Sequence, residues 1–124
     1  MIGTALAVAL GGAIGSTLRW LTGQAALRLI GPGFPWGTVT VNVLGSFLMG
    51  VLVVVLAERG GQRAAPFLMT GVLGGFTTFS AFTLDTVALV ERGQYMLAVA
   101  NAGGTVLIGL AALVLGMTLT RMVI

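Results

Sequence analysis

The most informative segment of the chain reads Gly71-Val-Leu-Gly-Gly-Phe-Thr-Thr-Phe-Ser-Ala-Phe-Thr-Leu-Asp85. It lies inside a hydrophobic region, yet the adjacent glycines Gly74 and Gly75 are followed closely by hydroxyl residues. Glycine weakens a helix, and a hydroxyl can replace a backbone hydrogen bond that is lost. Non-helical backbone at membrane depth is tolerated only where protein or a polar cavity satisfies the freed groups. The segment therefore predicts a helix that breaks near residues 74–78.

The composition of the chain is that of a membrane protein. Of its 124 residues, 57% are hydrophobic and only 7% are charged, and the mean hydropathy is +1.10. A soluble domain carries about 25% charged residues. The absence of Cys and His removes disulfides, most metal sites and the usual nucleophile–base pairs, so we do not expect an enzyme. The basic residues are scattered, so we do not expect nucleic-acid binding.

Charged residues divide the chain into four apolar segments, each long enough for the roughly 20 residues that a spanning helix needs. We expect spans at residues 3–25, 37–57, 65–91 with the break inside, and 95–120. Gly31-Pro-Gly-Phe-Pro35 predicts a turn between the first two, and Gly60-Gly61 predicts the end of the second. We interpret the first segment as a permanent span. The expected fold is a single all-α transmembrane domain whose third helix is broken in mid-membrane.

Small and polar residues recur on the faces of these spans. Gly11 and Gly15 form a small-xxx-small pair that predicts close helix packing. Thr38, Asn42 and Ser46 share one face of the second span. An amide in hydrocarbon is costly unless it is bonded, so the spacing of Asn42 leaves open helix–helix hydrogen bonding or a pore. Phe79, Phe82 and Asp85 lie along one ridge of the third span, and Asn101 and Thr105 share a face of the fourth.

Two motifs resemble the signature of the Fluc (CrcB) fluoride-channel family. They are Thr-Val-Asn-Val-Leu-Gly at residues 40–45 and Gly-Gly-Phe-Thr-Thr-Phe-Ser-Ala-Phe at residues 74–82, with an acid at Asp85. The resemblance covers nearly the whole chain. It implies a passive, fluoride-selective channel of the inner (plasma) membrane that exports cytoplasmic fluoride and confers fluoride resistance.

The resemblance also implies roles for individual residues. It gives a fluoride pore lined by Asn42, Phe79, Phe82, Ser80, Thr38 and Thr105. It places Arg19 in the vestibule and Asp85 at the end of a polar track. It implies a structural Na⁺ at the centre of a dimer, held by the backbone carbonyls of Gly74 and Thr77. In the outer part of this track, Asn101 and Gly109 depart from the residues of some family members.

Arg19 and Asp85 also fit a membrane protein that has no pore. Arg19 can extend along its span so that its charge reaches the membrane surface. Asp85 can be an interfacial carboxylate paired with an arginine. The positions of these two residues in the sequence are therefore compatible with either arrangement.

Charge balance and the resemblance both point to a dimer. Four spans place Arg59, Arg63 and Arg121 on one side of the membrane, against Arg28, Arg92 and, if it counts, Arg19 on the other. Orientation follows the Lys/Arg bias of short loops, which is almost absent here. We therefore expect insertion in both orientations and an antiparallel homodimer, for which the resemblance implies two pores.

Two other functions compete with a fluoride channel. A small proton-coupled multidrug exporter of the four-span dimeric type needs a carboxylate in the membrane, and Asp85 is its only candidate. A non-conducting helix-packing protein explains the small residues, but it does not explain Asn42 or the hydroxyls of residues 77–83. A fluoride pore must replace the water of a strongly hydrated ion with donors, and the electropositive edges of aromatic rings can contribute.

Overall fold

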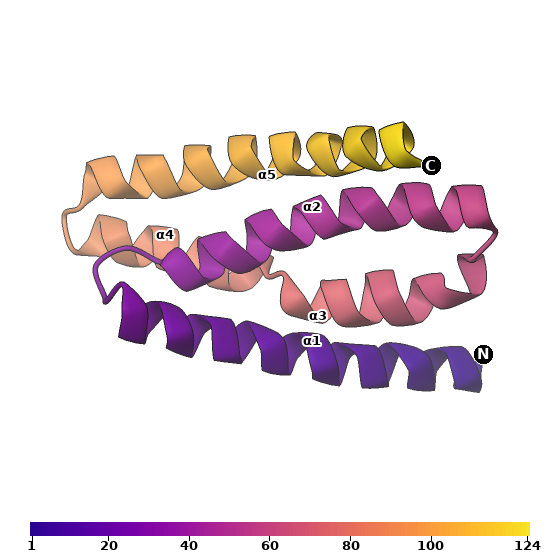
Figure 1. Ribbon diagram of the computed structural model, residues 1–124. Helices are drawn as coiled ribbons and strands as arrows, with labels where there is room; N and C mark the ends of the chain where they lie inside the picture. The colour runs from indigo at the N-terminus through magenta and orange to yellow at the C-terminus, as the bar shows by residue number, and fades with distance from the viewer.

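The computed structural model describes residues 1–124 as a bundle of helices that run alongside one another (Figure 1). Four helical segments are long and apolar enough to cross a membrane: Ile2–Leu29 (α1), Trp36–Arg59 (α2), Gln62–Glu91 and Tyr95–Val123 (α5). Both termini lie at one end of the bundle, with the α2-to-third-span connection (Figure 1). The α1–α2 and α4–α5 connections lie at the other end.

The helices begin and end close to the positions expected from the sequence. The largest difference is at the end of α1, which continues to Leu29 rather than residue 25. It continues because the first strong turn signal is Gly31-Pro32, where Gly31 has φ 101°. Gly60 ends α2 in the left-handed conformation at φ 68°, a region in which a side chain is strained. The predicted helix end at Gly60-Gly61 is therefore confirmed.

The third span is a succession of helical types rather than one α-helix. It consists of a 3₁₀ turn, a π-helical stretch, one short α-helical turn and a longer α-helix: η1 (Gln62–Ala64), η2 (Pro66–Leu73), α3 (Gly74–Phe76) and α4 (Phe79–Glu91). Between α3 and α4 the backbone is extended at Thr77 (φ −85°, ψ 159°) and Thr78 (φ −154°, ψ 122°). A break within residues 74–78 is thus confirmed.

The glycine pair lies beside the break and is not itself extended. Gly74 and Gly75 are both helical, and the break falls on the two threonines. A Cβ atom on Gly75 would lie 2.7 Å from the carbonyl oxygen of Gly12 in α1. Gly75 therefore allows two helices to approach closely. The sequence predicted only that this glycine loosens its own helix, and it did not predict this packing contact.

Glycine contacts hold the bundle together in two pairs of helices. α1 packs on η2 and α3, whereas α2 packs on α5 and α4 also contacts α5. Gly11 and Gly15 are buried on α1, and a Cβ atom on Gly15 would lie 2.8 Å from the Phe76 nitrogen. The close packing predicted from this pair is confirmed. Gly50 of α2 meets the α5 backbone at Leu113 in the same way.

The interior of one chain is small. Only 15 of 124 residues are buried. Val41, Leu73 and Phe76 form a buried apolar cluster, and Met49 and Leu52 pack against it. Most large hydrophobic side chains point outward. This distribution suits a protein whose surroundings are lipid tails or other membrane helices rather than water.

Candidate functional site

The broken segment is held by the side chain of Asn42 on α2. Its Nδ2 donates to the carbonyl oxygen of Thr78 at 3.0 Å, and its Oδ1 accepts from the Thr78 N–H at 2.8 Å. The amide thus pairs with extended backbone as a peptide group of a neighbouring strand would. Asn42 therefore bonds the second span to the third, at the extended backbone rather than at a helix, and it satisfies two backbone groups that an interrupted helix leaves unpaired.

Arg19 is directed at the same break from α1. Its Nε donates to the carbonyl oxygen of Gly75 at 3.0 Å, and the side chain is partly buried. The guanidinium is therefore bound within the bundle, rather than only extended toward the membrane surface. Because a guanidinium has five N–H groups, the remaining donors and the positive charge stay available near the break. The vestibule role of Arg19 stays a prediction.

The Gly74 and Thr77 carbonyls lose their usual helical donors at the break. In a continuous α-helix they would accept from the N–H groups of Thr78 and Ala81. Here the Thr78 N–H donates to Asn42, and the Ala81 N–H donates to the Thr78 Oγ1 at 3.1 Å. Hard cations bind oxygen ligands such as backbone carbonyls, so the two carbonyl oxygens suit the expected Na⁺. The chain has no cluster of His, Cys, Asp and Glu that would hold a different metal.

A groove of about 360 Å³ opens beside the break, and it brings together part of the predicted pore. Four predicted pore residues, Asn42, Phe79, Phe82 and Thr105, line it. The Phe79 and Phe82 rings are 5.9 Å apart at 48°, and Phe79 is 76% exposed. The other lining residues are Ser46, Thr77, Thr78, Val106, Gly109, Leu110 and Leu113.

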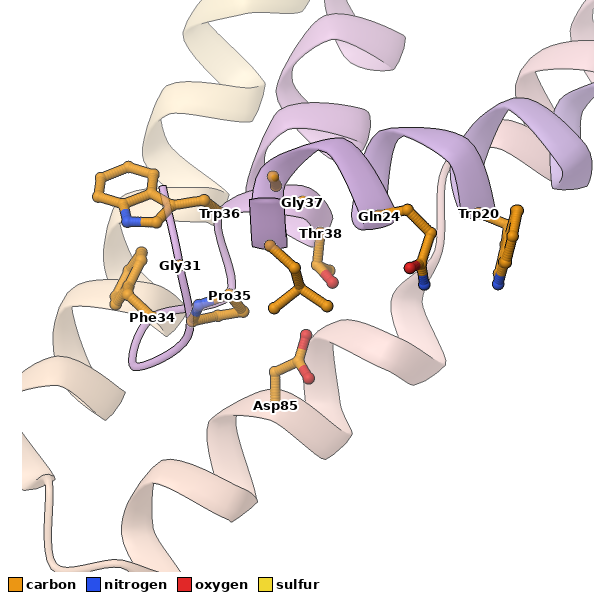
Figure 2. Close-up of a pocket in the computed structure, with 12 residues that line it drawn as sticks. Trp20, Gln24, Gly31, Phe34, Pro35, Trp36, Gly37, Thr38 and Asp85 are labelled. Carbon is orange, nitrogen blue, oxygen red and sulfur yellow. The ribbon is translucent and has the colours of Figure 1, made fainter. Parts of the chain in front are cut away.

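Thr38 and Asp85 lie in a second cavity, of about 280 Å³, between α1, α2 and α4. Figure 2 shows the Asp85 carboxylate below Thr38, with Gln24 and Trp20 of α1 along the same wall. No arginine lines this cavity, so the arginine partner considered for Asp85 is not found there. Thr38 is one helical turn from Asn42, and Asp85 is one turn from Phe82. The two cavities therefore follow one another along α2 and α4.

Ser80 is the predicted pore residue that lines neither cavity. Its side chain is exposed, and its Oγ lies 3.4 Å from the Oγ1 of Thr78. It lies in the first turn of α4, after the break, and faces the outside of the single chain. The fluoride contact expected of Ser80 stays a prediction.

A buried polar chain between α4 and α5 was not predicted from the sequence. Asn101 is fully buried, and its Nδ2 donates to the Thr86 Oγ1 at 2.9 Å. Thr86 in turn donates to the Phe82 carbonyl at 2.9 Å, and Thr105 donates to the Asn101 Oδ1 at 3.4 Å. The shared face of Asn101 and Thr105 was a usable signal, but the sequence did not reveal Thr86 as the partner across the helices.

Comparison with known proteins identifies a matching family. The family described as "CrcB-like protein, Camphor Resistance (CrcB)" matches residues 6–117 of the chain. The match includes every residue discussed above for the break and the two cavities.

Curated relatives match over nearly their full lengths and share one name. A protein of Cereibacter sphaeroides named "Fluoride-specific ion channel FluC" is 62% identical over 121 residues, covering 98% of this chain and 97% of the relative. Proteins of the same name are similar in Paracoccus denitrificans, at 54% identity over 95% of this chain and 94% of the relative, and in Agrobacterium fabrum, at 50% over 98% of each.

Proposed function

The chain belongs to the CrcB family, and from this we infer that it is a fluoride-specific ion channel. The observation that supports this most directly is the groove at the helix break. It combines an amide donor on Asn42 with the rings of Phe79 and Phe82. These groups carry no net charge, so they can replace part of the hydration shell of an anion without trapping it.

The two cavities suggest the route of the ion. We propose that fluoride passes between α2 and α4, along the groove at Asn42 and Phe82 and then the cavity at Thr38 and Asp85. The positive charge of Arg19 lies near this route and raises the local concentration of anions. The electropositive edges of the Phe rings and the hydroxyls supply contacts along it.

Transport through such a pore is passive. Hydrogen fluoride crosses membranes as the neutral acid and dissociates inside the cell, which traps the anion there. A membrane potential that is negative inside is worth about 2.3 kcal/mol per charge per 100 mV, so it drives fluoride outward. We propose that the protein acts in the inner (plasma) membrane and confers fluoride resistance in this way.

We propose further that the channel is an antiparallel homodimer with two pores. The near-even distribution of arginines supports insertion in both orientations. The small interior of the single chain and the outward position of Ser80 leave surface for a second copy.

In this dimer, Na⁺ would be held at the centre by the carbonyls of Gly74 and Thr77. They lose their helical donors in each chain, and a pair of chains doubles the number of oxygen ligands. The cation would supply fixed positive charge that offsets the charge of passing anions. It takes no part in any covalent step.

The alternative of a proton-coupled multidrug exporter is not favoured. Its relatives would be expected to carry a transporter's name, whereas the relatives found here are named as ion channels. Such channels are not enzymes. Asp85, the carboxylate that an exporter would need, also lies outside the groove that holds the aromatic pair.

Ion flux from liposomes tests the assignment. Purified protein in liposomes loaded with fluoride or chloride should release fluoride rapidly and retain chloride, as read by ion-selective electrodes. A proton-sensitive dye should report no obligatory exchange of protons for a lipophilic cation. Equal release of both anions, or proton-coupled release of the cation, would contradict a fluoride-specific channel.

A further inference from the structure

The hydroxyl groups that line the groove differ in whether their protons are already used. Ser46 donates to the carbonyl of Asn42 at 2.6 Å, and Thr77 donates to the carbonyl of Leu73 at 2.9 Å. Thr105 donates to the Oδ1 of Asn101, at the longer distance of 3.4 Å. A hydroxyl has only one proton. These three therefore present mainly acceptor oxygens to the groove, and an acceptor oxygen repels an anion.

Thr78 is different, because no carbonyl accepts its proton. Its Oγ1 accepts from the N–H of Ala81 at 3.1 Å, and its one other hydrogen-bond partner is the Ser80 hydroxyl, at 3.4 Å. In that pair either hydroxyl can donate to the other, so Ser80 can donate while the Thr78 proton remains free. Accepting a hydrogen bond polarises a hydroxyl and strengthens it as a donor.

The second free donor in the groove is on Asn42. Its Nδ2 carries two protons, of which one is donated to the carbonyl of Thr78. Because Asn42 pairs with both the N–H and the carbonyl of Thr78, the position of one residue is tied to that of the other. The two free donors are thus held next to each other, on a groove that also contains the Phe79 and Phe82 rings.

We propose that the Thr78 hydroxyl contacts fluoride in the groove and donates to the ion beside the Asn42 amide. This inference rests on the proposed function. It assigns the hydroxyl contact in this groove to Thr78 rather than to Thr105. The hydrogen-bonded chain Thr105–Asn101–Thr86 then fixes the wall of the groove, and Ser80 supports the donor.

The test must separate the donor from the helix cap, because Thr78 also begins α4 through its bond to Ala81. Thr78→Val keeps the shape and the extended backbone but loses both donor and cap. Thr78→Gly also loses the donor, whereas glycine at a helix N-cap costs only a few tenths of a kcal/mol. Thr78→Ser keeps both. Thr118→Val is the matched control, because its hydroxyl is exposed and donates to the carbonyl of Val114.

Fluoride efflux from liposomes is measured for wild type and the four variants, with assembly checked by size-exclusion chromatography; Ser46→Ala is measured beside them. We expect Thr78→Val and Thr78→Gly to lower the efflux rate by about tenfold or more, the range for a lost hydrogen bond to a charged group. Thr78→Ser should recover the rate to within about threefold of wild type. The efflux rate of Thr118→Val should match that of wild type, and Ser46→Ala should lower the efflux rate less than Thr78→Gly does.

Three results would overturn the assignment of Thr78. The first is wild-type efflux in Thr78→Gly, which would show that only the cap matters. The second is a fall in efflux rate in Thr78→Ser that is as large as the fall in Thr78→Val. The third is a loss in Ser46→Ala that equals that in Thr78→Gly. Absence of fluoride efflux from the wild-type protein is a separate result, because it would reject the channel function itself. If Thr78→Val does not assemble, Thr78→Gly and Thr78→Ser decide.

Discussion

At the scale of single residues, Asn42 combines a structural bond with a position on the groove. Its amide hydrogen-bonds to both the N–H and the carbonyl of Thr78, and one of its N–H protons remains unused beside the groove. A residue with these two roles cannot be replaced by one that fills only the same volume. The aromatic residues differ, because the ring of Phe79 is mostly exposed and that of Phe82 is half-buried beside it.

Asn42→Asp should abolish most of the fluoride flux. The carboxylate can still accept from the Thr78 N–H, but it loses the donor to the Thr78 carbonyl and repels the anion. We expect a folded dimer and a fall in efflux of tenfold or more, which corresponds to at least about 1.4 kcal/mol. Liposome efflux and size-exclusion chromatography measure the two quantities. Wild-type efflux in a well-assembled Asn42→Asp protein would remove Asn42 from the pore.

Phe82→Ile tests whether the aromatic pair does more than fill space. Isoleucine keeps apolar bulk but removes the electropositive ring edge. We expect efflux to fall by about an order of magnitude, with a smaller loss than in Asn42→Asp. The matched control is Phe47→Ile, because Phe47 lines a separate apolar groove between α2 and α5. Equal effects of the two substitutions would indicate that Phe82 only packs.

At the scale of helices, the bundle depends on contacts between backbones and on one buried polar chain. Gly11 and Gly15 of α1 face Gly71, Val72 and Phe76 of the third span. This contact brings the guanidinium of Arg19 to the carbonyl of Gly75. On the other side of the break, Asn101 joins α4 to α5. The two halves of the third span are therefore held by different helices.

Gly15→Ala should loosen the contact between α1 and the third span. The new methyl group would lie 2.8 Å from the Phe76 nitrogen and against the Val72 carbonyl. Backbone cannot move aside as a flexible side chain can, so we expect a loss of about 1–3 kcal/mol, typical of overpacking. Thermal unfolding in detergent, followed by circular dichroism, measures the lowered melting temperature.

Gly12→Ala is the control on the same helix, because a Cβ atom there meets nothing within 4 Å in the chain. It should be neutral or slightly stabilising, since alanine favours helix more than glycine does. A melting temperature for Gly15→Ala no lower than that for Gly12→Ala would contradict the backbone contact.

At the scale of the whole molecule, the single chain leaves part of the predicted pore exposed on its surface. Few residues are buried, Phe79 is mostly exposed, and Ser80 lies outside both cavities. Arginines are spread almost evenly between the two ends, and Arg19 is bound at the break rather than at either end. Neither end therefore carries a strong signal for the cytoplasmic side.

Reporters fused to the C-terminus should accordingly be active on both sides of the membrane. Two variants that each favour one orientation in the membrane make the test more specific. Val123→Lys adds positive charge at the end with the termini, and Gln94→Arg adds it at the opposite end. Each variant alone should favour one orientation and conduct less fluoride, whereas expressing both together should restore efflux. Full efflux from a chain that inserts in one orientation only would exclude the antiparallel dimer.

The sequence alone determined the number of spans, the place of the break and the resemblance to a fluoride-channel family. These depend on local properties, because the length of an apolar run sets a span and neighbouring residues form a motif. Gly60 and the Gly31-Pro32 turn were predictable for the same reason. Each acts through its own backbone conformation.

Only the tertiary structure decided what holds the break and how the polar residues are divided. Asn42 and Thr78 are 36 residues apart, and Arg19 and Gly75 are 56 apart, so no local pattern indicates that they bond. The sequence suggested that Gly75 breaks its helix. Its packing contact could not be seen there, because the partner, Gly12, is on another helix. Thr38 and Asp85 were separated from the groove because the packing of α1 against α2 encloses a second cavity. Contacts of this kind depend on how the helices pack, which helical periodicity within one span does not specify.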